Sequence, residues 1–437
     1  LNRIEVDLNL SNDKINGTHV DFKSSFPADS ASNTPAGLAV RTGTTTDPVY
    51  IDFDGNERIA ASTDAAIFEV NQFVHISGAF AFEKGPVVVA DIENNKGATI
   101  NDVRLDELTI GGSNVSVFVG QHGPYRIDSN NDLYWDSNDP INPDAQGFVI
   151  DDVDLGMSFL TPSQTQTNPQ ANTLTGTKYF SMKANANKVG LVGFDDDFKL
   201  SLNRVEVDLN LSNTKTSYVD FKSSFPADAK NNVPAGLAVR TGTTTDPVYL
   251  DFAGTELIAA STDAAIIEVS EFVHISGAFA FEKGPVVEAN VVERNAPLPV
   301  EHVKLDTLTI GGRHVSAFVG VNGPYRNDTN GDLQWDTNDP INPDAQGFVI
   351  DDVDFGMTFL SKSKSQTSPQ AAQISPTSKY FALKANANKV GIVGFDDDFK
   401  LSLNRIEVDL NLSNDKVNGT HVDFAASFPA DAKTKTP

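Results

Sequence analysis

The sequence predicts an all-β fold made of tandem repeats of about 200 residues, with mostly antiparallel strands and little helix. Two observations support this prediction. Polar and apolar residues alternate in many segments, as in a sheet with one buried face, and long motifs return at a spacing of about 200 residues. The sequence leaves open whether the repeats form β-sandwich-like units, a solenoid, a tubular sheet or one continuous elongated sheet.

Individual strands are indicated by this alternation. Ile4, Val6 and Leu8 alternate with charged or amide residues, and Phe80 and Phe82 share one face of a strand expected at residues 74–82. Further strands are expected at residues 49–53, 66–70, 105–110, 115–119, 148–157, 179–183 and 198–202. No segment keeps the i, i+3, i+4, i+7 spacing of an amphipathic helix, so helix is a minor component.

One predicted strand changes its apolar phase. The apolar residues fall on Leu200 and Leu202 and then on Val205 and Val207, which moves them from even to odd positions. A bulge or bend near residues 203–204 would keep all four on the same face, and we expect one there.

The repeat is visible from the first residues of the chain. The motif LNRIEVDLNLSND begins at Leu1, returns as LNRVEVDLNLSNT at Leu202 and is found unchanged at Leu403, so each step is 201 residues. Other motifs that occur twice are PAGLAVRTGTTTDPVY, FVHISGAFAFEKGPVV, INPDAQGFVIDDVD and VGFDDDFKLSLNR. The pattern predicts a tandem array cut out of frame, as in a window on a longer chain.

Two stretches inside the copies have the composition of linkers. They are TPSQTQTNPQANTLTG and SKSKSQTSPQAAQISPTS, both rich in Ser, Thr, Gln and Pro, whereas the seam between copies has no such stretch. We therefore expect a partial first copy at residues 1–160, a linker-like segment at 161–176, a complete copy at 177–360, a second linker-like segment at 361–378 and the start of a third copy at 379–437.

Composition excludes several classes of function. The chain of 437 residues carries 33 Lys and Arg against 59 Asp and Glu, a formal charge of −26. This charge repels nucleic acid and anionic membranes and attracts cations. Cysteine is absent, which excludes disulfides, thiolate metal sites and cysteine nucleophiles. No apolar run is long enough to predict a membrane helix.

Acidic and amide residues alternate in two twelve-residue stretches, which we call the acidic loops. They read DSNNDLYWDSND at residues 128–139 and DTNGDLQWDTND at residues 328–339, and they hold both tryptophans of the chain. Positions 1, 3, 5, 9 and 12 offer side-chain oxygens and position 7 offers a backbone carbonyl, which is the ligand pattern of a calcium loop. The candidate ligands are Asp128, Asn130, Asp132, Tyr134, Asp136, Asp139, Asp328, Asn330, Asp332, Gln334, Asp336 and Asp339.

This pattern resembles the EF-hand family, and more closely its dockerin-type variant, in which position 12 is Asp. The resemblance implies bound calcium and an apolar anchor at position 8, here Trp135 and Trp335. Position 6, usually Gly, is Leu133 or Leu333, and no flanking helices are evident. The alternative is a loop of Asx turns without metal. Four Asp carboxylates in one loop repel each other unless a cation lies between them, which favours calcium.

Other polar motifs give no comparable signal. The DDVD and DDD runs are typical of solvated strand ends or turns, although either is able to bind a further ion. His75 and His274 recur at matched positions on a predicted strand, where we expect half-exposed side chains and not general bases. Because no nucleophile, zinc or phosphate-binding motif is found, we expect no enzymatic activity.

The organisation resembles the repeat regions of giant bacterial surface and extracellular proteins, such as adhesins and filament-forming proteins. The resemblance implies a non-catalytic stalk or filament outside the cell or on its surface, rigidified by calcium, whose partners are neighbouring repeats or identical chains. The alternative is a repeated adhesin module that recognises carbohydrate, such as surface glycans, or an apolar surface. Phe residues on one face of a strand motivate that alternative.

Overall fold

The computed structural model describes residues 2–12, 18–30, 32–42, 48–194, 198–294, 298–395, 399–416 and 418–429. It is mostly β, and its two similar halves of about 200 residues follow one another along a large antiparallel sheet. None of the helices within these ranges has the length and apolar character that crossing a membrane requires.

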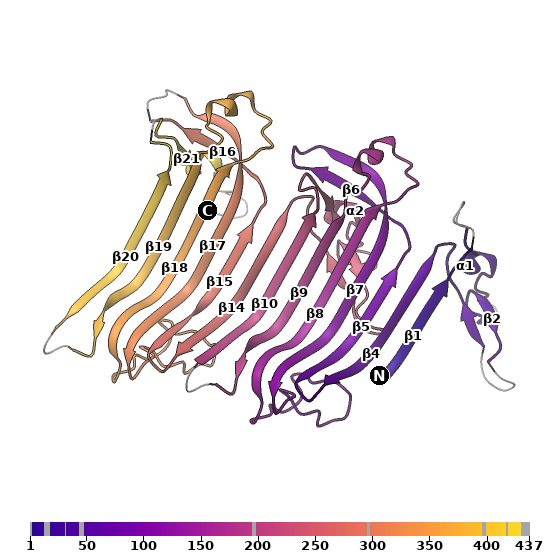
Figure 1. Cartoon of the computed structure of the whole chain (residues 1–437), viewed down its shortest axis with the longest axis horizontal. Helices are drawn as coiled ribbons and strands as arrows, with labels where there is room; N and C mark the ends of the chain where they lie inside the picture. Colours follow the sequence, from indigo (N-terminus) through magenta and orange to yellow (C-terminus); the bar gives the residue numbers. More distant parts are fainter. Residues whose placement is uncertain are drawn as a thin grey trace.

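A single main sheet runs through the whole described chain (Figure 1). Its long strands pair in the spatial order β1, β4, β5, β7, β8, β9, β10, β14, β15, β17, β18, β19, β20, always antiparallel. These strands are β1 (Asn2–Asn9), β4 (Arg58–Val70), β5 (Val74–Lys84), β7 (Thr99–Gln121), β8 (Gln146–Pro162), β9 (Tyr179–Val192), β10 (Phe198–Ser212), β14 (Leu257–Val269), β15 (Val273–Lys283), β17 (Val300–Val321), β18 (Gln346–Lys362), β19 (Lys379–Val393) and β20 (Leu401–Ser413).

Shorter elements lie at one end of these strands and over the sheet. They are α1 (Phe22–Ser25), β2 (Leu38–Val40), β3 (Val49–Ile51), β6 (Val88–Asn94), η1 (Pro169–Leu174), β11 (Ser217–Asp220), α2 (Phe221–Ser224), β12 (Leu237–Val239), β13 (Val248–Leu250), β16 (Val287–Val292), η2 (Pro369–Gln373), β21 (His421–Asp423) and α3 (Phe424–Ser427). Each of the three short α-helices begins after an Asp whose side chain accepts a backbone N–H of the first turn.

The repeats join by ordinary strand pairing. β9 and β10 pair from Leu200 opposite Leu191 to Ser212 opposite Tyr179, and β10 then pairs with β14. The linker-like segment at residues 161–176 connects β8 to β9, which also pair with each other, and its Ala171 is fully buried. The segment at 361–378 connects β18 to β19 in the same way. Of the alternatives that the sequence left open, the structure has the continuous sheet.

Long strands of the main sheet, such as β7, β8, β17 and β18, bend along their length (Figure 1). At the irregularity predicted near residues 203–204, Arg204 takes a left-handed φ of 50°. The equivalent Arg3 and Arg405 do the same, with φ of 47° and 54°. Because a left-handed residue rotates the strand beyond it, the apolar side chains before and after Arg204 stay on one face.

One face of the sheet, which we call the loop face, is covered by segments of the chain. A hairpin formed by β12 and β13, the second hairpin (residues 237–250), lies across β7, β8 and β9 of the preceding repeat. It encloses the largest core of the described chain. The buried residues of this core are Ala90, Ile92, Val103, Leu105, Leu160, Ala171, Leu174, Tyr179, Val219, Phe221, Leu237, Val239, Leu250 and Phe252.

The opposite face, which we call the open face, carries an apolar row. Strand pairing places Val6, Ala61, Phe82, Ile110, Met157, Met182 and Leu209 side by side. Alternation along each strand points these side chains away from the loop face. Val6 is 61% and Phe82 is 40% exposed, so this row is in contact with solvent.

Candidate metal centre

Each acidic loop connects two neighbouring long strands and folds back over the loop face. The first connects β7 to β8 and the second connects β17 to β18. Trp335 is buried, its backbone N–H donates to Ser276 Oγ at 3.0 Å, and its carbonyl accepts from Ser316 Oγ at 2.6 Å. Trp135 makes the equivalent bonds in the first copy. The tryptophan at position 8 therefore anchors the loop to two strands, as the resemblance implied.

The tryptophan rings pack on a buried histidine. The ring centroids of His274 and Trp335 lie 5.9 Å apart, and those of His75 and Trp135 lie 5.8 Å apart. Each histidine is 3% exposed, so the expectation of half-exposed side chains was wrong. The sequence did not indicate that the acidic loop would cover this part of the strand.

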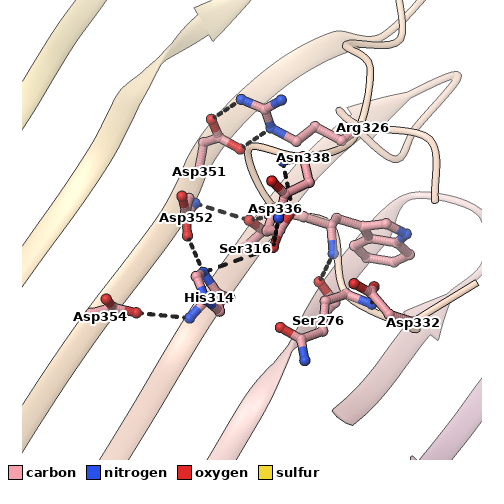
Figure 2. Close-up of polar contacts among 12 residues, drawn as sticks. Ser276, His314, Ser316, Arg326, Asp332, Asp336, Asn338, Asp351, Asp352 and Asp354 are labelled. Carbon is pink, nitrogen blue, oxygen red and sulfur yellow. Dashed lines mark hydrogen bonds and ion pairs between the residues drawn. The ribbon is translucent and has the colours of Figure 1, made fainter. Parts of the chain in front are cut away.

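An ion pair closes the base of each loop. Arg326 donates through Nε and Nη2 to both carboxylate oxygens of Asp351, at 2.6 and 2.8 Å, and through Nη1 to the carbonyl of Asp339 at 2.7 Å (Figure 2). Arg126 does the same with Asp151 and Asp139. Two-point pairing of a guanidinium with a carboxylate fixes geometry. The first Asp of each DDVD run is therefore a buried structural partner and not a solvated strand end.

The turn of the loop tolerates leucine at position 6. Leu133 and Leu333 have φ of 72° and 64°, the left-handed conformation that usually favours glycine. Asp328 Oδ2 accepts the N–H of Leu333 at 3.0 Å, and Oδ1 accepts that of Gly331 at 2.7 Å. The carboxylate at position 1 thus holds the backbone in this conformation.

Three carboxylates meet at the centre of the second acidic loop. One oxygen from each of Asp328, Asp332 and Asp339 lies within 4.8 Å of the others. Asp339 is 3% exposed; its Oδ1 accepts the N–H of Thr329 at 3.1 Å, but its Oδ2 is buried with no hydrogen-bond partner among the described residues. Asp139 Oδ2 is buried in the same state in the first loop. A buried carboxylate oxygen needs a partner, and a cation among these three groups supplies one.

The electrostatics of Asp339 agree with this geometry. Burial raises the pKa of Asp339, and the charges of Asp328 and Asp332 raise it further, against the backbone hydrogen bonds that lower it. The ionised form is therefore disfavoured in the absence of a positive charge. Carboxylate oxygens are the ligands that calcium prefers.

The remaining predicted ligands lie differently. Asn330 Nδ2 donates to Asp332 Oδ2 at 2.9 Å, next to the three carboxylates. Gln334 uses its side chain to bind the carbonyl of Asp263 at 3.1 Å, and the Tyr134 hydroxyl donates to the carbonyl of Asp64 in the first copy. The side chain at position 7 thus attaches the second acidic loop to β14 and the first to β4. The sequence predicted only a backbone ligand at this position and not this side-chain contact.

Asp336, at position 9, is not part of the three-carboxylate group. Its oxygens accept the backbone N–H and the side-chain amide of Asn338 at 2.7 and 3.0 Å, and Asp136 and Asn138 repeat these bonds. In Figure 2 Asp336 lies on the side of Ser316 and His314, apart from Asp332. Position 9 of calcium loops often acts through water, so this placement leaves three direct carboxylates.

A second acidic group contains Asp352 and Asp354 of the second DDVD run, which the sequence left as able to bind a further ion, together with His314, which the sequence did not indicate. His314 Nδ1 lies 2.8 Å from Asp352 Oδ1, and the backbone N–H of His314 donates to Asp354 at 2.9 Å (Figure 2). These three residues also bring one ligand atom each within 4.8 Å of the others. They are 38 and 40 residues apart and meet only because β17 pairs with β18. The first copy has Asn114 in place of His314.

The DDD runs, at residues 195–197 and 396–398, lie outside the described residues. Comparison of the chain with models of protein families, with curated proteins and with solved structures found no match.

Proposed function

We propose that this chain is a non-catalytic structural segment of a bacterial extracellular stalk or filament, in which calcium bound by the acidic loops rigidifies each repeat. The observation that carries this proposal is the pairing of β9 with β10, by which one repeat passes into the next within a single sheet. A sheet that continues through the repeat seam is able to lengthen with every added copy.

The geometry gives the expected growth per repeat. Each copy contributes six long strands to the main sheet, for example β14, β15, β17, β18, β19 and β20. With strands about 4.8 Å apart, one repeat adds about 29 Å to the length of the sheet. Electron microscopy of this chain and of a version extended by one 201-residue copy tests this value. Two compact particles joined by a tether, in place of one longer ribbon, would contradict the proposal.

The reason to propose bound calcium is Oδ2 of Asp339, which is buried and has no hydrogen-bond partner among the described residues. When calcium is bound, Asp328, Asp332 and Asp339 hold it, with the position 7 carbonyl and Asn330 as further oxygen ligands. Binding to the folded state alone stabilises it, by about 1.4 kcal/mol per site at ten times the dissociation constant. The loop connects β4, β5 and β7: Tyr134 binds Asp64 of β4, and Trp135 binds Ser77 of β5 and Ser116 of β7, so a stiffer loop stiffens three strands of the sheet.

A calcium titration of thermal stability tests the metal site. We expect the melting temperature of the whole chain to rise with calcium and to fall back with EDTA. The double variant Asp139→Asn and Asp339→Asn should lose most of this rise, because it removes the carboxylate with the orphaned oxygen from both loops. The matched control is Asp344→Asn, which removes an exposed charge just after the loop.

Two outcomes decide between calcium and a metal-free loop. An unchanged melting temperature with calcium, or an equal rise in the Asn double variant, would leave the loops as Asx turns. The repulsion among the carboxylates also predicts that the double variant is more stable than the unmodified chain in EDTA. A less stable double variant in EDTA would contradict the account of Asp339.

The exposed apolar row favours a second candidate, a repeated adhesin module. Phe82 and Phe159 of the first copy and Phe281 and Phe359 of the second are between 38% and 43% exposed on the open face. Phe159 also packs on Phe180, and Phe359 on Phe381, with ring centroids 5.0 Å apart. Aromatic side chains on a flat face suit carbohydrate rings or another apolar surface. Binding to a glycan array that Phe159→Ser and Phe359→Ser abolish would support this candidate.

A further inference from the structure

The open face is apolar well beyond the single row described above. Strand pairing places a further row on each side of it, because every second residue of a strand points to the same face. Leu108, Phe159 and Phe180 belong to one of these rows. Gly112 and Leu155 belong to the other. The open face therefore carries three neighbouring rows of mostly apolar residues.

The rows continue from the first half of the sheet into the second. Leu209 of β10 pairs with Ile258 of β14, and the same row passes through Leu308, Phe359 and Phe381. The repeat seam thus does not interrupt the apolar surface.

Charged residues are nearly absent from these rows. The three rows contain Lys84 in the first half and the equivalent Lys283 in the second, and no other charged residue. Each lysine is the last residue of its strand and is paired with a glutamate, at 3.2 Å in the first half and 3.0 Å in the second. The interior of the open face therefore has no charge in either half.

The loop face has a different composition. Its row next to the apolar rows contains Glu5, Lys183 and Asp208. The acidic loops lie over this face, and the second hairpin covers the surface of β7, β8 and β9, which we call the floor of that hairpin. With a formal charge of −26 on the chain, two copies repel unless their charged faces point away from each other. Contact through the open faces meets this condition.

The apolar side chains of the open face reach solvent in the middle of the sheet. Phe82, Phe159, Phe281 and Phe359 are between 38% and 43% exposed. Their strands, β5, β8, β15 and β18, are each paired on both sides, so this exposure is not a property of a sheet edge. Contiguous apolar surface of more than a few hundred Å² usually marks an interaction site. We therefore expect a partner on this face.

The size of the face is sufficient for a stable contact. Its thirteen long strands, about 4.8 Å apart, span about 58 Å, and three rows with their side chains are about 20 Å wide. The face therefore offers about 1,000 Å² per chain, compared with about 800 Å² per partner in a standard protein interface.

The relief of the face suits a second sheet of the same kind. Ala61 pairs with Phe82, so a small side chain lies beside a large one. Gly112 lies between Phe80 and Leu155 in the same way. In packed sheets, large side chains of one layer enter the spaces left by small side chains of the other, with the layers about 10 Å apart.

We propose that the open face packs on the open face of a second copy of this chain, which gives a two-layered β-sandwich. The occupant is a copy of the chain because it supplies the same uncharged surface over the same length, with both the large and the small side chains that interdigitation requires. A contact between identical patches closes on itself, so full overlap gives a dimer. This inference rests on the proposed structural role and names the contact between chains, but it does not depend on calcium.

Sedimentation velocity of the full chain over a range of concentrations, in EDTA, tests the contact. We expect the mass to rise with concentration and to level off at the dimer. The double variant Phe82→Asp and Phe281→Asp places a charge in the middle of both halves of the contact and should weaken association at least about tenfold. Because both side chains are partly exposed, the fold of the single molecule should survive, which circular dichroism verifies.

A mixing experiment separates loss of the contact from loss of the fold. The double variant Phe82→Lys and Phe281→Lys should also fail to associate by itself. An equimolar mixture of the Asp and Lys variants should associate more tightly than either alone, because the two open faces then carry opposite charges. No gain on mixing would overturn the proposal, because it would mean that the open faces do not meet.

The matched control is the double variant Ile141→Asp and Ile341→Asp. These residues are 54% and 53% exposed, lie two positions after the acidic loops and occupy equivalent places in the two halves. Dimerisation that survives in this control and is lost in the Phe82 and Phe281 double variant supports the proposal. The reverse result would overturn it, and so would a mass that grows beyond the dimer.

Other occupants of the open face give different results. A chain that stays monomeric at all concentrations overturns the proposal. If that monomer also floats with phosphatidylcholine vesicles, or binds a glycan array through Phe159 and Phe359, the face is assigned to lipid or to carbohydrate. The growth of a single sheet per added repeat and the calcium titration are measured independently of these outcomes, so the proposals fail separately.

Discussion

The loop face over β7, β8 and β9 and the loop face over β17, β18 and β19 have nearly the same sequence and different surroundings. The first is covered by the second hairpin and contains a core of fourteen buried residues, of which Leu237, Val239, Leu250 and Phe252 come from the hairpin and the residues just after it, whereas the equivalent core at β16 to β19 has ten. The hairpin that covers β7, β8 and β9 comes from the repeat that follows them. The core of the first half is therefore shared between two successive repeats.

The comparison also shows that the same residue in the same motif is buried in one half and partly exposed in the other. Leu237 and Leu38 occupy the same place in identical motifs, but only Leu237 has a floor beneath it. Substitutions at matched positions of the two halves therefore measure how much the contact itself contributes to the free energy of unfolding, because the residue type is the same in both.

The largest expected difference is at the hairpin leucines. Leu237→Ala should lower the free energy of unfolding by about 3 kcal/mol, because it leaves a cavity in the covered core. Leu38→Ala should lower it by less than about 1 kcal/mol, since this side chain is already partly in water. Urea unfolding of both variants measures the pair at a concentration where the chain is monomeric. Equal effects would mean that the second hairpin is not packed as described.

The next largest difference in the free energy of unfolding is expected at Asp64, which binds the tip of the second hairpin. Asp64 Oδ1 accepts the N–H of Thr243 and Thr244 at 2.7 and 2.8 Å, whereas the equivalent Asp263 has an exposed side chain paired with Arg204 at 3.0 Å. Asp64→Ala should therefore cost about 2 kcal/mol, and Asp263→Ala less than about 0.5 kcal/mol.

The pH dependence of Asp64 gives a second readout. Burial alone would raise the pKa of Asp64, but hydrogen bonds from Thr244 and Thr243 outweigh it and the pKa is lowered. The stabilisation is therefore fully present above the unfolded pKa of about 3.9 and is lost as the pH falls through the folded value. Acid unfolding curves should be shallower in Asp64→Ala than in Asp263→Ala.

A smaller difference is expected at the two floor glycines. Gly156→Ala should destabilise the chain by about 1.5 kcal/mol, because the added methyl group meets Val239 and Val248. Gly356→Ala meets nothing within 4 Å and should be neutral or stabilise by about 0.5 kcal/mol, since glycine in a strand loses more entropy on folding than alanine. Thermal melts of the two variants measure this contrast, and a loss of stability in both would contradict it.

The smallest effect concerns a carboxyl group on the covered floor. Burial raises the pKa of Glu107 to about 8, with a further contribution from Glu83. Stability is then highest below the unfolded pKa of about 4.3 and decreases as the pH rises towards 8, because the unfolded state releases the proton first. The second copy has Thr307 at this position. Glu107→Thr should stabilise the chain by about 1 kcal/mol at pH 7 and by less at pH 5; Glu107→Gln should also remove the pH dependence.

Much of the fold was predictable from local pattern. Alternation located the strand at residues 74–82, which is part of β5, and the change of apolar phase located the left-handed residue Arg204. The composition of residues 161–176 did not show that Ala171 would be buried, because Ser, Thr and Gln also suit a packed connection whose polar groups bond to neighbouring strands. Gln166 illustrates this: its side chain bonds to the backbone of Arg104 on β7.

Some features of the candidate site were also predictable from the sequence, and others were not. Position-by-position chemistry identified the acidic loop and the anchoring role of Trp135 and Trp335, since these depend on twelve consecutive residues. The ion pair of Arg326 with Asp351 and the contact of His314 with Asp352 were not predictable, because their partners come from different strands.

The sequence by itself determined the all-β character, the 201-residue period and the candidate calcium ligands, because strand alternation, repeated motifs and loop chemistry are properties of neighbouring residues. Only the tertiary structure decided that the repeats share one sheet, that the second hairpin covers β7, β8 and β9 of the preceding repeat, and that Oδ2 of Asp139 and of Asp339 is left without a partner among the described residues. Those features depend on strand register and on contacts between residues far apart in the chain. The hairpin sequences at residues 38–51 and 237–250 are nearly identical and do not indicate which hairpin is covered.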